Sequence, residues 1–487
     1  MENKTVWEKY DRKMVEECDA FGRDYIDFLS DCKTERECAD EIRKEAEAAG
    51  YTNLEQKIRE GGALKPGDKV YRVNMGKSIL LYNIGKDPIE DGMNLLGAHI
   101  DSPRLDVKQN PLYEDGGFAY LDTHYYGGIK KYQWVTLPLA IHGVICRKDG
   151  TKVPVRIGED PGDPVFFVSD LLIHLAQEQM KRNGATVVEG EALDLIIGNR
   201  PLVFKEKEGS ASYKLMNSSD APEGSAKKEA ENAVKQGVLD ILKKSYGMEE
   251  EDFYSAELEI VPAGRAREAG FDRSMILSYG QDDRVCAFGS YRAMLEVRDV
   301  KRTACCILVD KEEIGSVGAT GMQSRFFENT TAEVLHLLGT DSGLSLRRCL
   351  ANSNMLSSDV SSAYDPLYAS SFDKKNVAYL GRGMVFNKFT GARGKSGSND
   401  ANAEYIAHLR EIFDEENVQF QFSELGKVDL GGGGTIAYIL ALYGMNVIDS
   451  GVAVLSMHSP WEATSKADVF ETMRGYKAFL RKAVKLG

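Results

Sequence analysis

The chain has 487 residues, more than the roughly 250–300 that one hydrophobic core usually organises, so two domains are expected. Hydrophobic residues make up 43% of the sequence and charged residues 28%, which is an ordinary globular balance. The formal net charge of −14 disfavours nucleic acid and anionic membranes as partners, because both repel an acidic surface.

Membrane and secretory signals are not apparent. No apolar run approaches the ~20 residues that would span a bilayer, and the polar N-terminus carries no signal-peptide core. The eight cysteines are scattered and form no CxxC pair. Cys305 and Cys306 lie in an apolar, strand-like run, where reduced thiols act as small hydrophobic side chains. These features predict a cytoplasmic protein.

The first 50 residues predict helices. Thr34 and Glu37 form a capping-box pattern ahead of a periodic segment that runs to Ala49, and Gly50 is a typical stop signal. Three strand-like runs follow, at residues 70–73, 78–82 and 93–98.

The middle of the chain has a different pattern. Residues 105–170 alternate short strand-like pieces with Gly and Pro, which predicts a mostly β domain inserted into an α/β one. Residues 205–253, rich in Lys, Glu, Ser and Ala, predict a solvated loop and then a surface helix in the same insert. Past Glu257 the α/β rhythm returns, with helices at 283–297 and 435–444 and strands at 304–309, 354–357 and 451–456.

Several acids and imidazoles directly follow predicted strands, at the sheet edge where ligands collect in open α/β folds. His99 ends one such strand, and Asp101 lies two residues on. A metal-bound imidazole usually donates its second N–H to a carboxylate, so Asp101 suits that role. Taken alone, the His-x-Asp pattern also fits a surface turn at a strand end.

Two adjacent acids, Asp282 and Asp283, open the predicted helix at 283–297. Acids at a helix start are ordinarily explained by the helix dipole. The functional alternative is a carboxylate that bridges two metal ions.

The most informative segment is 310–316, where Asp310, Glu312 and Glu313 crowd the end of an apolar strand. Like charges there are costly unless cations offset them. One glutamate can bind metal while its neighbour takes a proton from water. The alternative, an exposed acidic loop, is disfavoured by the apolar lead-in at 304–309.

Two further candidates follow apolar pieces: Asp359 and His458. A lone histidine at such a place is often structural. Together, however, two histidines and three carboxylates suit a pair of zinc ions, because imidazole and carboxylate are both good zinc ligands.

A tetraglycine at 431–434 precedes the predicted helix at 435–444. It lacks the Lys and Ser/Thr of a phosphate loop, so nucleotide binding is disfavoured. The glycines fit either close approach of the backbone to a bound peptide or a simple flexible turn.

With these motifs in hand, the chain resembles the aspartyl aminopeptidase family of co-catalytic zinc metallo-aminopeptidases. The resemblance spans nearly the whole chain and rests on residues 97–103, the Asp282–Asp283 pair, 310–316, 358–359 and 457–459. It implies an α/β fold: a mixed-sheet zinc-peptidase catalytic domain (1–103 and 256–487) with an inserted β-rich dimerisation domain (104–255).

The resemblance also implies an activity, the hydrolysis of N-terminal residues from peptides, and a role for each site residue. Two zinc ions are expected, with cobalt or manganese as other options, and Asp282 bridges them. Glu312 is the implied general base and Asp101 the partner of His99. His174 is implied to reach a neighbouring subunit's active site, within dimers that assemble to a dodecamer. The implied metal ligands are His99, Asp282, Glu313, Asp359 and His458.

Some family features differ. The family's Asp-Arg pair is absent from 134–139, and histidines common after the last acidic ligand are replaced at 360–366. Lys388 is the nearest match to the lysine that holds an acidic substrate side chain. The preference for an acidic N-terminal residue is therefore left open.

Two other functions are compatible with parts of the pattern. A metal-dependent amidohydrolase or deacylase of N-acyl amino acids would keep the same ligands but would not require a free N-terminus. An inactive assembly scaffold would be expected to have lost some of the five ligands, and none is lost.

Overall fold

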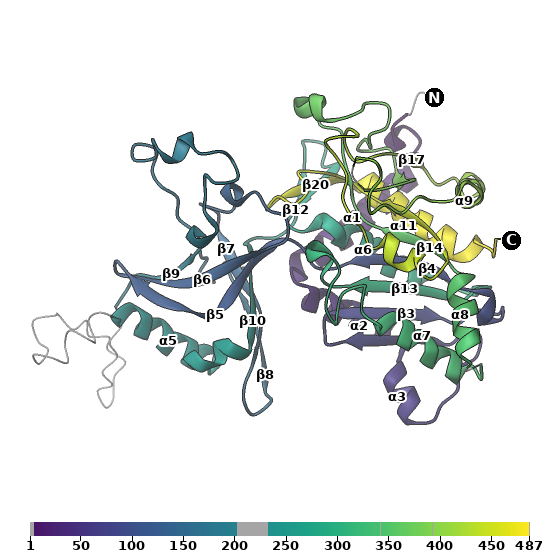
Figure 1. Cartoon of the computed structure of the whole chain (residues 1–487), viewed down its shortest axis with the longest axis horizontal. Coiled ribbons are helices and arrows are strands. Elements are labelled where there is room, and N and C mark those ends of the chain that lie inside the picture. Colours follow the sequence, from purple (N-terminus) through teal and green to yellow (C-terminus); the bar gives the residue numbers. More distant parts are fainter. Residues whose placement is uncertain (1–3, 202–231, 341, 392, 487) are drawn as a thin grey trace, which may run out of the picture. The chain divides into compact units, whose positions relative to one another are not determined.

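The computed structural model describes residues 4–201, 232–340, 342–391 and 393–486. The chain divides into two compact units (Figure 1). The larger unit comprises Met1–Ser102 and Arg265–Gly487, and the smaller unit is Pro103–Gly264. Within the described residues, no helix has the length and apolar character that crossing a membrane requires.

The predicted N-terminal helices are confirmed as α1 (Arg12–Asp31) and α2 (Glu35–Ala48). The capping box forms as expected: the Thr34 side chain accepts from the Glu37 N–H, and the Glu37 side chain accepts from the Thr34 N–H. Gly50 follows with a φ of 88°, a left-handed conformation that favours glycine.

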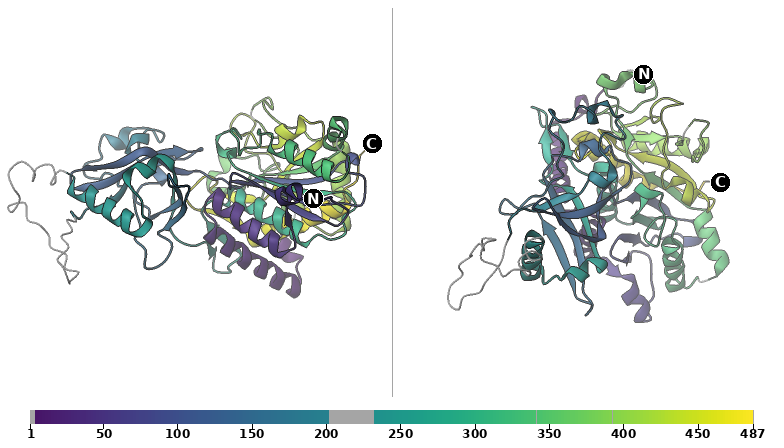
Figure 2. Two further views of the ribbon diagram at one scale, coloured as in Figure 1. Left: turned by 90° about the horizontal axis from the view of Figure 1, so that it is seen from below. Right: turned by 60° about the vertical axis from the view of Figure 1, so that its left-hand side comes forward.

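A nine-stranded mixed sheet forms the centre of the larger unit, which confirms the predicted α/β class (Figures 1 and 2). Every residue of its three central strands is buried, as expected for a sheet that is covered on both faces. These strands, β13, β4 and β14, run parallel to one another. The strand order is β1 (Thr52–Asn53), β2 (Lys69–Asn74), β3 (Ser78–Asn83), β13 (Ala304–Val309), β4 (Asn94–His99), β14 (Asn354–Ser358), β18 (Asn446–Gly451), β16 (Met384–Asn387) and β17 (Phe420–Phe422).

Helices cover both faces of this sheet, and alternate side chains of each strand enter different cores. Leu96 packs in the core under one set of helices, whereas Leu95 packs in the other. The first set is α1, α2, α6 (Gln281–Glu296), α9 (Ala403–Glu415) and α11 (Lys466–Lys482). The second set is α3 (Leu54–Arg59), α7 (Phe326–Leu337), α8 (Gly343–Ala351) and α10 (Ala437–Ala441).

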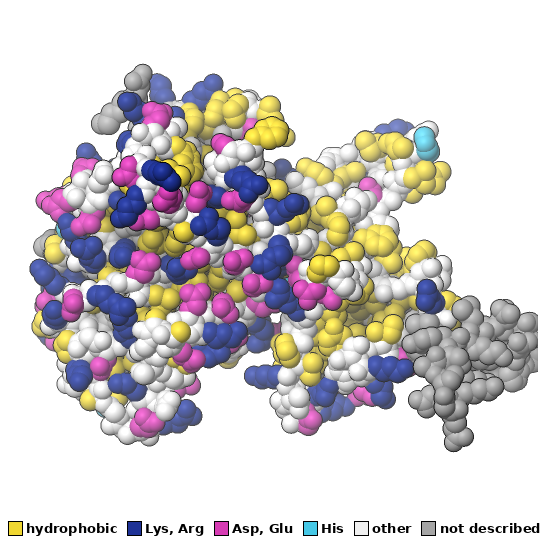
Figure 3. Space-filling view, turned by 180° about the vertical axis from the view of Figure 1, so that it is seen from behind, with side chains coloured by type: hydrophobic (Ala, Val, Ile, Leu, Met, Phe, Trp, Pro, Cys, Tyr) yellow, Lys and Arg dark blue, Asp and Glu magenta, His cyan; other side chains and the backbone are white. Residues whose placement is uncertain are grey.

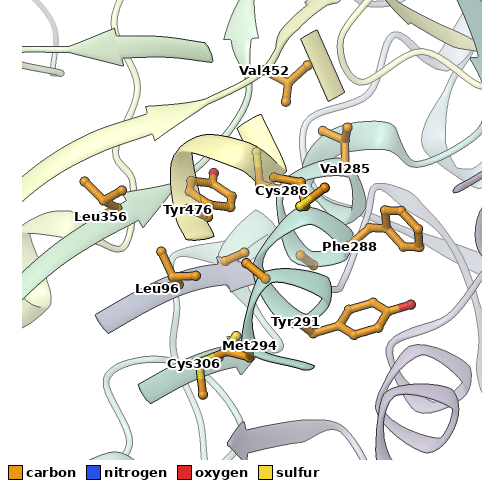
Figure 4. Close-up of a cluster of buried hydrophobic side chains, with 14 of the residues drawn as sticks. Leu96, Val285, Cys286, Phe288, Tyr291, Met294, Cys306, Leu356, Val452 and Tyr476 are labelled. Carbon is orange, nitrogen blue, oxygen red and sulfur yellow. The ribbon is translucent and has the colours of Figure 1, made fainter. Parts of the chain in front are cut away.

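Helix α6 is buried along most of its length against the central strands. Figure 4 shows Phe288 and Met294 of α6 in one apolar cluster with Leu96 and Cys306 of the sheet. Phe288 also contacts the rings of Phe21, Tyr25 and Phe28 from α1. This packing sets the position of the whole helix, including its first turn.

A second, five-stranded sheet completes the larger unit, in the order β11 (Arg267–Ala269), β12 (Met275–Ser278), β20 (Glu462–Ser465), β19 (Ala453–Leu455) and β15 (Ser361–Ser362). The strand predicted at 451–456 is confirmed in part, at Ala453–Leu455. Strand β18 ends at Gly451 in the main sheet, and β19 begins at Ala453 in the second sheet. The chain passes from one sheet to the other at Val452. The sequence does not indicate this change, because the apolar residues continue across it.

The smaller unit is built on a six-stranded antiparallel sheet, in the order β8 (Lys152–Ile157), β7 (Leu139–Cys146), β10 (Ala256–Pro262), β5 (Arg104–Asp115), β6 (Phe118–Tyr126) and β9 (Leu195–Gly198). One helix, α5 (Ala233–Tyr246), packs beside it, where a surface helix was predicted. The predicted solvated loop falls largely on residues 202–231, outside the described part. Figure 3 shows hydrophobic side chains gathering on the surface of this unit.

Candidate metal centre

Three neighbouring parallel strands end at one edge of the main sheet and bring four predicted site residues there. His99 is the last residue of β4, and its strand partner is Val309, the last residue of β13. Glu312 and Glu313 follow in a short 3₁₀ turn, and Asp359 comes directly after β14. Because parallel strands end at the same edge, residues far apart in sequence meet there.

Asp282 and His458 reach the same place from the second sheet. Asp282 lies in the first turn of α6, shortly after β12, and His458 lies in the loop between β19 and β20. The expectation that each ligand follows a strand of one open sheet is therefore too simple, because two of the five are delivered by a different sheet.

The five predicted ligands form two groups of atoms that share Asp282. His99 Nε2 lies 3.3 Å from Asp282 Oδ1 and 4.0 Å from Asp359 Oδ1. His458 Nε2 lies 3.1 Å from Asp282 Oδ2 and 3.7 Å from Glu313 Oε2. Each oxygen of the Asp282 carboxylate thus faces a different histidine.

These separations fit zinc. Zinc-to-ligand bonds of about 2.0–2.1 Å in a tetrahedral arrangement place neighbouring ligand atoms about 3.4 Å apart. Glu313 Oε1 is buried and has no hydrogen-bond partner among the residues that the structure describes. A buried carboxylate oxygen without a hydrogen-bond partner is costly, and a cation would offset that cost. The neighbouring imidazole and carboxylate side chains are suitable metal ligands.

The charge states of the site reflect burial and crowding. Burial opposes ionisation of Asp282, but the adjacent imidazoles of His458 and His99 outweigh it and hold the Asp282 pKa below its usual range. Burial, aided by the negative charge of Asp282, raises the pKa of Glu313 and of Asp359 well above the usual value. Without cations, these two carboxyl groups therefore keep their protons to higher pH than usual, whereas a bound metal would require them ionised.

Glu312 lies near His99, with Oε2 4.0 Å from His99 Nε2, and together with His99 and Asp359 it forms a set of side chains that could itself hold a metal ion. Burial is the main cause that raises the pKa of Glu312 to about 7. A carboxylate with a pKa near neutrality is well suited to accept and return a proton.

Asp101 connects the histidine strand to the glutamate turn. One of its carboxylate oxygens lies 3.3 Å from His99 Nδ1, and its backbone carbonyl oxygen lies 3.0 Å from the same nitrogen. The same carboxylate accepts hydrogen bonds from the backbone N–H groups of Glu312 and Glu313, each at 3.2 Å. Asp101 therefore orients an imidazole and holds the turn that carries both glutamates.

Glu462 is a positioning residue that the sequence interpretation missed. Its side chain accepts a hydrogen bond from the His458 N–H at 2.7 Å and another from the Asp282 N–H at 3.1 Å. It is 1% exposed, and burial raises its pKa to about 8. An acid four residues after a candidate histidine, at the first residue of β20, was the available signal.

The remaining candidates lie elsewhere. Asp310 is fully buried, but it accepts hydrogen bonds from Thr320 Oγ1 and the Lys311 N–H, so it braces the loop. His174 lies in an exposed turn of the smaller unit. Lys388 is an exposed residue that follows β16.

Comparison with known proteins identifies the family. Residues 28–480 match the M18 peptidase family, described as aminopeptidase I zinc metalloprotease. The chain belongs to this family. A probable M18 family aminopeptidase 1 of Clostridium acetobutylicum is 58% identical over 479 residues, 98% of each chain. The corresponding protein of Thermotoga maritima is 44% identical over 483 residues, 99% of each chain.

Solved structures agree with the fold at full length. The crystal structure of aminopeptidase I from Clostridium acetobutylicum has a TM-score of 0.88 at 56% identity, with 99% of this chain and 100% of that chain covered. An M18 aminopeptidase from Thermotoga maritima has a TM-score of 0.89 at 44% identity, with the same coverage.

These similarities confirm the resemblance drawn from the motifs and the predicted fold class. The chain is a metal-dependent aminopeptidase of the M18 zinc metallopeptidase family. Neither a deacylase of N-acyl amino acids nor an inactive scaffold is supported by the relatives, all of which are named as aminopeptidases.

Proposed function

We propose that this M18 aminopeptidase holds two zinc ions, bridged by Asp282. One ion would be held by His99 and Asp359, and the other by His458 and Glu313. The observation that carries the proposal is the orientation of Asp282, whose two oxygens lie 3.3 Å and 3.1 Å from the two histidines. Bound zinc supplies Lewis acidity that polarises the scissile carbonyl group and makes water more acidic.

The protein's own groups then move the proton and hold the geometry. Glu312 takes a proton from the attacking water and returns it to the leaving amine, because a pKa of about 7 suits both transfers. Asp101 keeps the His99 ring in place and keeps Glu312 within reach through its backbone N–H. Glu462 holds the His458 and Asp282 backbones at a fixed separation.

The number of ions is tested by metal analysis of purified protein. We expect about two zinc ions per chain, and about one or fewer in an Asp282→Ala variant, because both groups share that carboxylate. A variant that retains both ions would rule out the bridging role.

Substrate preference is tested by assays on a panel of amino-acid anilides, each with a free or an acetylated α-amine. We expect turnover only of the free amines. The resemblance implies an acidic first residue, whereas the altered stretches at 134–139 and 360–366 leave that preference open. The anilide with the highest kcat/KM shows whether the preferred first residue is acidic.

We also infer that the smaller unit mediates self-association, as the resemblance to dimeric and dodecameric relatives implies. Support comes from exposed apolar side chains beside His174, at Leu172 (54% exposed), Ile173 (65%) and Leu175 (67%). A yeast relative is described as a dodecamer, although at 19% identity it shares only the fold. In such an assembly His174 would enter the active site of a neighbouring subunit.

Sedimentation measurements of the native protein test the assembly, and His174→Ala tests the contribution across subunits. We expect that variant to keep its assembly and zinc content but to lose turnover. A cytoplasmic location is proposed as well, and it is supported by eight cysteines that form no disulfide, seven of them buried.

A further inference from the structure

The tetraglycine segment at 431–434 lies at the same edge of the main sheet as the metal centre. Strands β4, β14 and β18 are parallel, so all three end at that edge. Helix α10 follows the tetraglycine and directly precedes β18, so it begins at the edge where β18 ends. The contact of its first turn agrees, because Ile436 Cδ1 lies 3.4 Å from the position of a Cβ atom on Gly97, two residues before His99.

The start and the middle of the segment are fixed by backbone hydrogen bonds. Gly431 donates its N–H to the Lys427 carbonyl oxygen at 2.8 Å. The Gly433 carbonyl oxygen accepts from the Gly391 N–H at 3.1 Å. These bonds argue against a simple flexible turn, which is one of the two interpretations that the sequence allows.

Asp449 of β18 fixes the other end. Its Oδ1 accepts from Thr435 Oγ1 at 2.5 Å, and Thr435 Oγ1 in turn accepts from the Ala437 N–H at 3.3 Å. Asp449 is fully buried, and burial is the main cause that raises its pKa to about 7, with a contribution from the negative charge of Glu312. The group that anchors the segment is therefore close to the proposed general base.

Gly433 and Gly434 expose their backbone between these anchors. Both residues are exposed, and their N–H groups have no acceptor among the residues that the structure describes. Neither has a left-handed φ, and a Cβ atom added to either would have nothing within 4 Å. Neither the backbone conformation nor packing within the protein requires glycine at these two positions. Close approach of a ligand's backbone would require it.

Exposed apolar side chains lie beside this backbone and beside the glutamate turn. Ile314, directly after Glu313, and Tyr438 of α10 are both exposed. Gln323 connects their segments, because its Nε2 donates to the Gly315 carbonyl oxygen at 2.9 Å and to the Tyr438 hydroxyl at 3.3 Å. Apolar surface next to backbone donors, at a catalytic edge, is typical of a surface that a peptide covers.

The chemistry of an aminopeptidase says which part of the peptide this is. Only one residue precedes the bond that is cleaved, and its carbonyl group is the scissile one. Every other carbonyl oxygen of the substrate therefore belongs to the leaving part.

We propose that Gly433 and Gly434 bind the leaving part of the peptide, by donating an N–H to the carbonyl oxygen of the second substrate residue. Thr435 and Asp449 are then positioning residues, which hold this backbone in place before the substrate arrives. The inference rests on the metal centre proposed above. It makes peptides, and not simple amides of one amino acid, the preferred substrate class.

The test compares two substrates of the zinc-loaded protein that share the first residue preferred in the anilide panel. One continues as an alanine methylamide and has the second carbonyl group; the other is an isopropylamide, in which a methyl group replaces that carboxamide. Released amino acid is quantified by chromatography. In Gly433→Ala we expect KM for the methylamide to rise at least tenfold relative to KM for the isopropylamide, because the added Cβ meets only the bound peptide.

The hydroxyl group of Thr435 is tested with the same two substrates. Thr435→Val removes the hydroxyl at nearly constant volume and should shift the ratio of KM values in the same direction. Thr435→Ser keeps the hydroxyl and should restore the native ratio. Gly162→Ala, in the smaller unit, is the matched control, because its added Cβ also has nothing within 4 Å. Zinc content and Tm of each variant are measured on the same samples.

A change of KM that is confined to the methylamide and absent from Gly162→Ala supports the proposal. Equal losses on both substrates would place the segment against the first residue and overturn it, as would native KM values in Gly433→Ala. A loss in Thr435→Val that Thr435→Ser does not restore would contradict the role of Asp449. If the native protein cleaved neither substrate, the proposed function itself would fail, and this inference with it.

Discussion

Asp101 accepts a hydrogen bond from the backbone N–H of Glu312 at 3.2 Å, across 211 positions of sequence. The same side chain lies 3.3 Å from His99 Nδ1. One residue thus connects the imidazole of a proposed metal ligand to the proposed general base, so that their separation is set by the protein and not by the substrate.

Removing the charge of Asp101 should weaken both roles. In Asp101→Asn we expect zinc affinity and kcat to fall about 10–100-fold, the usual effect of losing a partner of a metal-binding histidine. Zinc affinity is measured by competition with a chromogenic chelator, and kcat under zinc saturation. If kcat is unchanged in the variant at full zinc occupancy, Asp101 contributes to zinc binding and not to turnover.

Glu312→Gln should separate metal binding from chemistry. Glutamine keeps the size of the side chain but cannot accept the proton, so kcat should fall about 10²–10⁴-fold while zinc content stays at the native level. Elemental analysis and steady-state kinetics on the same sample provide the measurement. Glu312→Asp, which keeps a shorter base, should recover part of the loss; native turnover in Glu312→Gln would exclude Glu312 as the base.

Zinc removal should lower stability as well as activity. The carboxyl groups of Asp282, Glu313 and Asp359 are packed together, and cations offset their repulsion. At a zinc concentration 100-fold above Kd, binding should add about 2.7 kcal/mol to the free energy of unfolding. Thermal unfolding before and after chelation, followed by zinc add-back, measures this. An unchanged Tm in the chelated protein would argue against a buried cation site.

Zinc affinity should rise with pH. In the metal-free protein, burial raises the pKa values of Glu313 and Asp359, so their protons remain bound to higher pH than usual. Zinc must displace those protons, and a reaction that releases protons is favoured as pH increases. Calorimetry in buffers of different ionisation enthalpy counts the protons released. Binding without proton release across the neutral range would contradict the predicted protonation.

Gly451 permits the approach of two ligand-bearing segments. A Cβ atom at this position would lie 2.0 Å from the Asp359 carbonyl oxygen, so Gly451→Ala must displace Asp359. We expect kcat/KM to fall about 100-fold, as for other misplacements near 1 Å. Gly162→Ala is the control, because nothing lies within 4 Å of its added Cβ. Equal kinetics for the two variants would show that the strand adjusts without moving the ligand.

Local sequence determined much of this protein. The capping box at Thr34, the strand at 304–309 and the acids after it follow from short-range rules, since caps and continuous apolar runs have few alternative structures. The motifs also indicated the family and the set of residues that meet at the metal centre. Each of these signals lies within about ten residues.

Only the tertiary structure decided how those residues meet. The separation of β18 from β19 at Val452, the delivery of Asp282 and His458 by a second sheet and the bridging role of Glu462 depend on contacts between distant segments. Local patterns cannot specify such contacts, because they form only when the whole core packs and brings the strand ends together.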